Sequence, residues 1–384
     1  DAVFFADGHA ALDVNDGPRW FLERLTAMAA MARATERIGL VSTVSSTFGT
    51  PFHVARQLAS LDHISRGRMG WNVVTSMFDV EARNHGYEAM PPHDWRYQRA
   101  EEMVNAVQAL WDSWDDDALV HDRQGDFVRP GSVRAVDHRG EHFRVDGPLT
   151  VPRPPQGHPV LFQAGASEQG RDLAARRAEA VYAVAYDLPA AQSYYSDIKR
   201  RVAAAGRTSP VPIMPGLVVY VGSTEAEARA RQRALDELLP VASSLRQLGG
   251  FVGQDCSGWA LDEPVPPLPP LSAFKGPQGR YGTILRIVET ERPTVRQLLG
   301  RLAAGGGHCT MVGTPEQIAD QMAHWWRNGG ADGFNLMPPA LPRDIDDFVD
   351  HVVPVLQQRG LFRRDYEGHT LRDHLGLARP PGRS

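Results

Sequence analysis

The stretch "VLFQAGASEQGR" at residues 160–171 has the pattern of a strand, a tight turn and a helix. Gly165 and Ser167 stand where the apolar residues end and the helical pattern begins. The backbone N–H groups that open a helix have no partner within it, so they and the serine hydroxyl could bind a phosphate. The serine could instead serve only as the N-cap of the helix. The stretch therefore predicts either a phosphate site or a plain helix start.

A second candidate is "HDWRYQRAEE" at residues 93–102, which has a helical pattern. His93 and Tyr97 are four residues apart and share one face of that helix. Both side chains can donate hydrogen bonds to a phosphate. The alternative is that His93 caps the helix and Tyr97 packs against its neighbours.

Several common catalytic patterns are missing from the sequence. Its fourteen histidines include no His-Glu-x-x-His pair, and neither Cys256 nor Cys309 has a partner at metal-ligand spacing. There is no Gly-x-Ser-x-Gly elbow, and "GASEQG" is not a dinucleotide-binding fingerprint. The sequence therefore predicts no metal centre, no serine hydrolase and no Rossmann-type dehydrogenase.

Apolar strand-like segments alternate with amphipathic helices along the chain. The expected strands cover residues 2–6, 38–44, 68–76, 160–163, 180–185, 213–221 and 332–338. The expected helices cover roughly residues 20–36, 51–65, 93–114, 168–178, 190–204, 224–238, 314–329 and 344–360. This alternation predicts a parallel sheet buried on both faces, and seven strands favour an α/β (β/α)8 TIM barrel over a doubly wound sheet.

Polar residues follow the expected strands where a barrel enzyme builds its site. They are Asp7, Ser45, Ser46, Thr75, Ser76, Ser167 and Asn335. Any one of them could simply mark the point where polarity resumes, but their recurrence after five strands favours a common site.

Two segments break the alternation. Residues 115–147 are polar and include a hairpin-like pattern at 138–147, and residues 240–307 are rich in proline and glycine without a clear period. The second segment contains Phe251, Trp259, Phe274 and Tyr281, more aromatic residues than a linker needs. We expect residues 1–384 to form one barrel domain, with 240–307 as a lid inserted late in the barrel.

The composition excludes several partners. The 384 residues carry a formal net charge of −5, which gives no reason to expect nucleic acid or an anionic membrane. No apolar run is long enough to cross a membrane, and two cysteines cannot build a disulfide framework. These features predict a cytoplasmic protein.

Five motifs, taken together, resemble one family. They are "DHISRGRMGWNVVTS" at 62–76, "HDWRYQRAEE" at 93–102, "FQAGASEQGRDLAARRAEAVY" at 162–182, "VGTPEQIAD" at 312–320 and the segment from "DGFNLMPPALP" at 332–342 to "DFVDHVVPVLQQRGLFR" at 347–363. In this order they resemble the bacterial-luciferase-like flavin monooxygenases, in the branch of nitrilotriacetate monooxygenase, dibenzothiophene-sulfone monooxygenase and the pristinamycin synthase large subunit.

The resemblance implies a (β/α)8 barrel that binds reduced FMN (FMNH2). A separate NAD(P)H:flavin reductase would supply the flavin, and O2 would react with it to give a C4a-peroxide or hydroperoxide that oxygenates a small organic substrate. A homodimer or homotetramer is also implied. Relatives act on amine carboxylates, aryl sulfones, alkanes and natural-product intermediates, so the sequence does not identify the substrate.

Carried over onto this sequence, the resemblance places Asp7 and Thr43 along the isoalloxazine ring. It makes Asn72 and Ser76 the candidate catalytic residues near the reactive edge of the ring, with Ser76 also contacting the cofactor.

The resemblance also assigns the phosphate. His93, Tyr97 and Ser167 would hold it, assisted by the N–H groups that follow Gly165. Of the two interpretations of the Gly-Ala-Ser turn, the resemblance thus favours the phosphate site.

The sequence departs from the family in three places. The family has a first strand and helix before "FFADG" at 4–8, which this sequence lacks, and the segment between Asp7 and Trp20 is shorter than usual. Met77 stands where some relatives have a histidine. Two alternatives therefore remain: a deazaflavin-dependent oxidoreductase of the same fold, and a flavin-binding protein without catalysis.

Overall fold

The structure, a computed structural model, describes residues 1–10, 22–120, 122, 125–274 and 278–382. Its contacts divide the chain into two compact units. Unit 1 comprises Asp1–Val181, Lys199–Pro212 and Asp365–Ser384, and unit 2 comprises Tyr182–Ile198 and Ile213–Arg364. Among the described residues, no helix has the length and apolar character needed to span a membrane.

Unit 1 is built on a parallel sheet with the strand order β1-β2-β3-β6-β7. The strands are β1 (Ala2–Phe5), β2 (Gly39–Ser45), β3 (Met69–Val74), β6 (Val160–Gln163) and β7 (Ala180–Ala183), whose last two residues belong to unit 2. Its helices are α1 (Arg24–Ala34), α2 (Pro51–Ser65), α3 (Asp79–Asn84), α4 (His93–Trp111), α5 (Glu168–Arg177) and α14 (Leu371–His374). The predicted hairpin is the antiparallel pair β4 (His138–Arg139) and β5 (Arg144–Val145). The long helix α6 (Leu188–Ala204) runs across the division between the units.

The side chains of these strands alternate between two buried faces. Leu40, Met69, Trp71, Val73 and Leu161 pack with α1, α2 and α4 in one apolar core. Because neighbouring side chains on a strand point to opposite faces, the residues between them belong to the other face of the sheet. A sheet buried on both faces is what the alternation of strands and helices predicts.

The second face is strongly curved. The rings of Phe4 on β1 and Phe162 on β6 lie 5.8 Å apart, centroid to centroid, in an edge-to-face arrangement. Two strands separate β1 from β6, so in a flat sheet these strands would be about 14 Å apart. The contact therefore requires the sheet to curl towards this face, as in a barrel.

The C-terminal segment packs at the N-terminal ends of the strands. A Cβ atom on Gly39 would lie 2.5 Å from Leu371 Cδ1, and one on Gly70 would lie 3.1 Å from Leu371 Cδ2. Next to Leu371, the buried Arg372 forms a two-point ion pair with Glu179 at 2.7 and 2.8 Å. This end of the sheet is therefore filled by protein, which leaves the C-terminal ends of the strands for a site.

Unit 2 contains three parallel strands, β8 (Ile213–Val221), β9 (Cys309–Gly313) and β10 (Asn335–Leu336). Its helices include α7 (Glu225–Glu237), α11 (Pro315–Arg327), α12 (Arg343–Asp347) and α13 (Val353–Gln358), with a π-helical turn at Phe348–Val352. The seven expected strands are present, and β9 is one that the sequence analysis missed. The α/β fold with parallel strands is confirmed.

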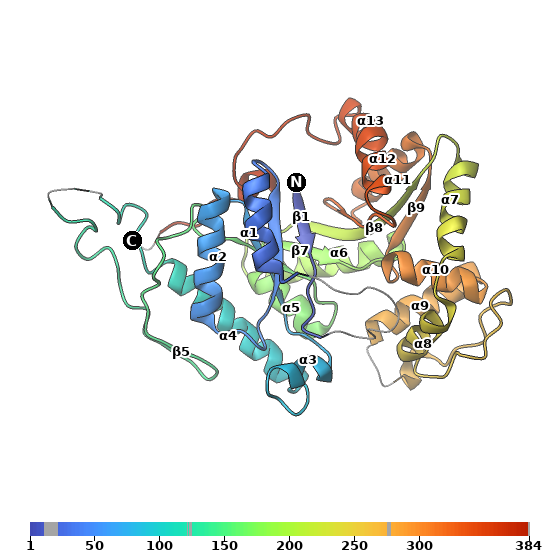
Figure 1. The fold of residues 1–384 in the computed structure, drawn as a ribbon, viewed down its shortest axis with the longest axis horizontal. Helices are drawn as coiled ribbons and strands as arrows, with labels where there is room; N and C mark the ends of the chain where they lie inside the picture. Colours follow the sequence, from blue (N-terminus) through green and yellow to red (C-terminus); the bar gives the residue numbers. More distant parts are fainter. Residues whose placement is uncertain (11–21, 121, 123–124, 275–277, 383–384) are drawn as a thin grey trace. The chain divides into compact units, whose positions relative to one another are not determined.

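The insertion at 240–307 differs from its sequence-based description. It forms the helices α8 (Val241–Val252), α9 (Gln278–Glu291) and α10 (Val295–Gly305), which appear together in Figure 1. Leu248, Tyr281, Ile287 and Leu298 are among the residues of a core that these helices share. Proline and glycine concentrate in the connections and hide the helical periods, so the expectation of a segment without periodic faces was wrong.

A buried carboxylate joins α2 to the sheet. Asp62 accepts hydrogen bonds from the backbone N–H groups of Met69 (3.1 Å) and Gln156 (3.2 Å) and from Gln156 Nε2 (2.7 Å). Its side chain is fully buried, and this burial raises the pKa of Asp62 to about 6 despite the three donors. The protonated form is thus favoured by folding, so the stabilisation is complete below the ordinary pKa of 3.8 and is lost as the pH rises through about 6.

We therefore expect Asp62→Asn to remove the contribution of this carboxyl group to the pH dependence of the unfolding free energy. Relative to this variant, the wild type should lose about 2 kcal/mol of unfolding free energy between pH 4 and pH 7. Urea denaturation at unit steps of pH measures the difference. The exposed Asp126→Asn variant is the control and should follow the wild type; parallel curves for Asp62→Asn and wild type would contradict the assignment.

Candidate functional site

Asn335, one of the polar residues expected at a strand end, lies on β10 in unit 2. The residues that the family resemblance assigns to the site all lie in unit 1, near the C-terminal ends of its strands or at the starts of α4 and α5. They are Asp7, Thr43, Asn72, Ser76, His93, Tyr97, Gly165 and Ser167. They form two groups. The strand-end group, at or just after the C-terminal ends of β1, β2 and β3, consists of Asp7, Thr43, Asn72 and Ser76. The second group, which joins the start of α4 to the turn before α5 and the start of that helix, consists of His93, Tyr97, Gly165 and Ser167.

The first group includes a buried pair on the curved face. Thr43 and Asn72 are partners in the register of β2 and β3, and Asn72 Nδ2 donates to Thr43 Oγ1 at 2.9 Å. Both side chains are more than nine-tenths buried. Asn72 Oδ1 has no hydrogen-bond partner among the described residues. A buried acceptor left unpaired costs about 1–3 kcal/mol, so this position suits a ligand that donates an N–H.

Ser76 adopts an uncommon backbone conformation. Its φ is +52°, in the left-handed region that residues other than glycine rarely enter. Its hydroxyl lies 2.9 Å from Ser45 Oγ, across from the end of β2. Arg96 on α4 donates to the carbonyl oxygens of Ser76 and Thr75, the second at 3.1 Å. A strained residue of this kind costs about 1–3 kcal/mol and persists because its neighbours fix it.

Two residues that the sequence did not single out hold the loop at 75–78, which follows β3. Arg96 is nine-tenths buried, and burial lowers the pKa of its guanidinium. Glu81 is buried too; its carboxylate accepts the backbone N–H groups of Met77, Phe78 and His9, each at 3.1 Å. It thereby ties the loop after β1 to the loop after β3. A glutamate three residues after Phe78, at the third position of α3, was the available signal.

Asp7 is placed among charged groups after β1. Its Oδ1 lies 3.6 Å from Arg24 Nε and its Oδ2 lies 3.9 Å from His9 Nε2. Burial raises the pKa of Asp7, and the positive charges of His9 and Arg24 act against that rise. The carboxylate is therefore easier to protonate than an exposed aspartate.

The second group forms a cradle. Tyr97 OH lies 3.5 Å from Ser167 Oγ, and the rings of His93 and Tyr97 are 4.8 Å apart, centroid to centroid. Ser167 also accepts the N–H of Gly170 at 3.2 Å, so it is the N-cap of α5. The two interpretations of Ser167 are compatible, because the cap leaves the hydroxyl beside Tyr97.

Glycine is required on both sides of this cradle. A Cβ on Gly165 would lie 2.7 Å from Gly170 Cα, and one on Gly170 would lie 3.0 Å from Tyr97 Oη. The turn and the helix thus approach more closely than side chains permit. The N–H groups of Glu168 and Gln169 open α5 here, where no preceding helical carbonyl is available to them. Together with the hydroxyls, they suit a phosphate.

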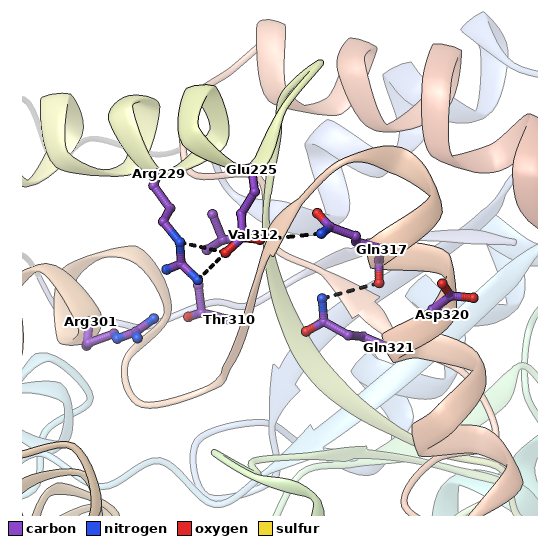
Figure 2. A pocket seen from close by; sticks show the side chains of 8 residues that line it. All are labelled: Glu225, Arg229, Arg301, Thr310, Val312, Gln317, Asp320 and Gln321. Atoms are coloured by element: carbon purple, nitrogen blue, oxygen red, sulfur yellow. Dashed lines mark hydrogen bonds and ion pairs between the residues drawn. The ribbon is translucent and has the colours of Figure 1, made fainter.

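Unit 2 contains a separate hollow (Figure 2). A cavity of about 400 Å³ is lined by Glu225, Arg229, Arg301, Thr310, Val312, Gln317, Asp320 and Gln321. Two of its charged groups, Glu225 and Arg229, pair with each other. Arg229 donates to Glu225 at 2.6 and 2.8 Å, and Gln317 Nε2 reaches the same carboxylate at 3.4 Å. None of the candidate residues lines this cavity.

Unit 2 also buries a histidine that the sequence analysis did not single out. His308 Nε2 lies 2.9 Å from Tyr182 OH, and a Cβ on Gly216 would meet the His308 ring at 2.4 Å. Burial lowers the pKa of His308 to about 4, with a further contribution from the charge of Arg280. The ring is therefore neutral near pH 7.

The pair of Thr43 and Asn72, the loop at 75–78 and the cradle of Tyr97 and Ser167 all belong to unit 1, which is built on a parallel α/β sheet. The sequence comparison gives the family. The model of the luciferase-like monooxygenases matches residues 1–333, and the chain belongs to this family. It is an enzyme, a monooxygenase.

Three relatives show how close the similarity is. Nitrilotriacetate monooxygenase component A of Aminobacter aminovorans is 47% identical over 366 residues, covering 94% of this chain and 80% of the relative. Dibenzothiophene-sulfone monooxygenase of Rhodococcus erythropolis is 42% identical over 362 residues, covering 94% and 80%. One subunit of the pristinamycin IIA synthase of Streptomyces pristinaespiralis is 43% identical over 388 residues, covering 99% and 86%. The resemblance inferred from the five motifs is confirmed.

Two solved structures agree with this. EDTA monooxygenase from Chelativorans sp. BNC1 has a TM-score of 0.82 and 35% identity, covering 99% of this chain and 88% of its own. A riboflavin lyase, solved with modified FMN and riboflavin, has a TM-score of 0.85 and 32% identity, covering 100% and 87%.

The geometry of the strained loop gives a prediction. Arg96→Lys keeps the charge but cannot reach both carbonyls in the same way, so the loop at 75–78 should open more often. A lost charge-assisted hydrogen bond of about 1.5–3 kcal/mol corresponds to roughly 10- to 100-fold faster amide exchange at Met77 and Phe78.

Arg99→Lys is the matched control, because Arg99 donates to Thr47 and Gly49 after β2 instead. Hydrogen exchange read by mass spectrometry compares the two variants. Equal acceleration at 77–78 in both variants would show that Arg96 does not hold this loop specifically.

Proposed function

We propose that this monooxygenase uses reduced FMN, supplied by a separate NAD(P)H:flavin reductase, to insert one atom of O2 into a small organic substrate. The observation that carries the proposal is the cradle of Tyr97, Ser167 and the start of α5, where two glycines allow a close backbone approach. It has the donors and the shape for a ribityl phosphate and lies in the same unit as the strand-end group.

The residues present fit FMN along its length. His93, Tyr97 and Ser167, with the first N–H groups of α5, would hold the phosphate. Asp7, Thr43 and Asn72 would lie along the isoalloxazine ring, whose N–H groups match the buried acceptor Asn72 Oδ1.

The protein's own contribution would be binding, orientation and the exclusion of water. When bound, the reduced flavin supplies the two electrons with which O2 yields an oxygenated substrate and water. Ser76, fixed by Arg96 and Ser45, would present its hydroxyl at the reactive edge with little motion. The helical insertion at 240–307 would act as the lid that keeps water out, and a homodimer or homotetramer in the cytoplasm would be the working form.

The partner follows from what the chain lacks in sequence. It has no dinucleotide fingerprint, so NAD(P)H would be oxidised elsewhere. Two relatives are named as one part of a larger system, the first as a component and the second as one of the subunits of a synthase, which supports a second protein. The substrate class is left open, since the relatives' names include an aminocarboxylate and a sulfone.

The phosphate cradle can be tested by affinity. Tyr97→Phe and Ser167→Ala each remove a hydrogen bond to a charged phosphate, which should cost about 1.5–3 kcal/mol, or roughly tenfold or more in the Kd for FMN. Riboflavin has no phosphate, so its Kd should stay nearly constant. Fluorescence titration with both flavins measures this.

Thr224→Ala controls for the loss of an N-cap, because Thr224 caps α7 through the N–H of Glu227 as Ser167 caps α5. It should lower stability without changing FMN affinity. Equal losses of FMN and riboflavin affinity in the cradle variants would mean that they damage the fold rather than a phosphate site.

The two-component assignment has its own test. The purified chain with FMN should not consume NADH, and oxygenation should begin when an NADH:flavin reductase is added. Oxygen uptake and NADH absorbance follow both stages. NADH oxidation by the chain alone would contradict the need for a reductase. Transfer of a hydride to or from a deazaflavin cofactor in the absence of O2 would favour the alternative, a deazaflavin-dependent oxidoreductase.

A further inference from the structure

Two histidines from separate loops meet beside Asp7. His9 Nδ1 and His85 Nε2 are 2.7 Å apart, a hydrogen bond in which one nitrogen must donate and the other accept. His9 follows β1 and His85 follows α3, so the pair joins segments 76 residues apart. Neither histidine is among the residues that the family resemblance assigns to the flavin.

The pair is fixed from both sides. The His85 ring stacks on Phe48 with centroids 4.2 Å apart and planes 6° apart, and Tyr87 packs on the same Phe48. The His9 backbone is held through its N–H by Glu81 at 3.1 Å and through its carbonyl by Asn84 at 2.7 Å. Such support fixes the two rings in a hydrogen-bonding geometry.

The chain of groups runs from a largely buried carboxylate to solvent. The side chain of Asp7 is 18% exposed, that of His9 is 29% exposed, and His85 is exposed. Among the residues that the structure describes, the other charged groups facing the histidines are Glu23 and Arg24 at the start of α1 and Glu81 from α3. Three carboxylates, with one arginine, make this a poor site for an anion and a good one for a mobile proton.

The proposed reaction has a use for such a proton. With neutral reduced flavin, the two flavin hydrogens are enough to form water with the second oxygen atom. With the flavin as the anion FMNH−, the balance reads FMNH− + O2 + S + H+ → FMN + SO + H2O, where S is the substrate. One proton must then come from solvent to a largely buried site.

We propose that His85, His9 and Asp7 form a proton relay that delivers this proton from solvent to the strand-end site. The inference rests on the proposed function, because it needs Asp7 beside the bound flavin.

Each step of the relay gains one proton and loses one. His85 takes a proton at Nδ1 and releases the one on Nε2 to His9 Nδ1; His9 then releases the proton on Nε2 to Asp7 Oδ2. The first transfer crosses the 2.7 Å hydrogen bond. The second crosses 3.9 Å, so the carboxylate must move by about 1 Å to reach hydrogen-bond distance.

The electrostatics bring the relay groups closer together in proton affinity. Partial desolvation of the exposed His85 ring and the neighbouring His9 lower the pKa of His85, so the uncharged ring, which can accept a proton, is favoured near pH 7. Burial raises the pKa of Asp7 above the ordinary value of an aspartate. Transfer from imidazolium to carboxylate is therefore closer to balance than between exposed groups.

The first test uses the flavin-free protein and needs no turnover. Ring nitrogens of His9 and His85 are followed by ¹H–¹⁵N NMR from pH 5 to pH 8. Because a charge on His9 disfavours a charge on His85, His9→Gln should raise the pKa of His85. Tyr87→Phe, which keeps the ring on Phe48, is the control and should leave it unchanged. A His85 titration that ignores His9→Gln would overturn the relay.

The second test uses the working two-component enzyme. His85→Phe keeps a ring on Phe48 and removes both nitrogens. We expect kcat to fall about tenfold at pH 8 and less at pH 6, where protons are 100-fold more abundant, with the KM and the Kd for FMN unchanged. Tyr87→Phe should match the wild type throughout.

The outcomes separate the two proposals. A wild type that oxygenates substrate, together with a His85→Phe variant that keeps its full kcat from pH 6 to pH 8, would overturn the relay alone. A wild type that neither binds FMN nor oxygenates would contradict the proposed function and the relay with it.

Discussion

The burial of both faces of the parallel sheet in unit 1 is the constraint on which the site depends. One face packs against α1, α2 and α4, and the other curls until Phe4 and Phe162 touch. Leu371 and Arg372 fill the N-terminal ends of the strands. Polar chemistry is thus confined to the C-terminal ends, where Thr43 and Asn72 pair and the loop of Ser76 is held by Arg96.

Much of this arrangement could be predicted from local sequence. The strand and helix periods indicated the parallel α/β fold, and the Gly-Ala-Ser turn before a helix indicated the start of α5. The strand β9 was missed because its five residues directly follow a glycine-rich stretch and precede a helix signal. The helices of the insertion were missed because proline-rich connections obscure their periods.

The parts of the site that depend on distant partners could not be predicted. Arg96 looks like any arginine on an amphipathic helix until the carbonyls of residues 75 and 76 are placed beneath it. Glu81 and His85 both contact His9 in the loop after β1, which is more than 70 residues away in the sequence. No local pattern around either residue indicates this contact. Family motifs identify residues that contact the cofactor more readily than those that hold such residues in place.

In the proposed complex, unit 1 binds the flavin with its phosphate at α5 and its ring along β2 and β3. A crystal structure of the protein with FMN, grown or soaked without oxygen after reduction, tests this most directly. We expect phosphate oxygens about 3 Å from Tyr97 Oη and Ser167 Oγ, with a ring N–H donating to Asn72 Oδ1. Flavin bound elsewhere, for instance in the polar cavity of unit 2, with the Tyr97–Ser167 cradle empty, would contradict it.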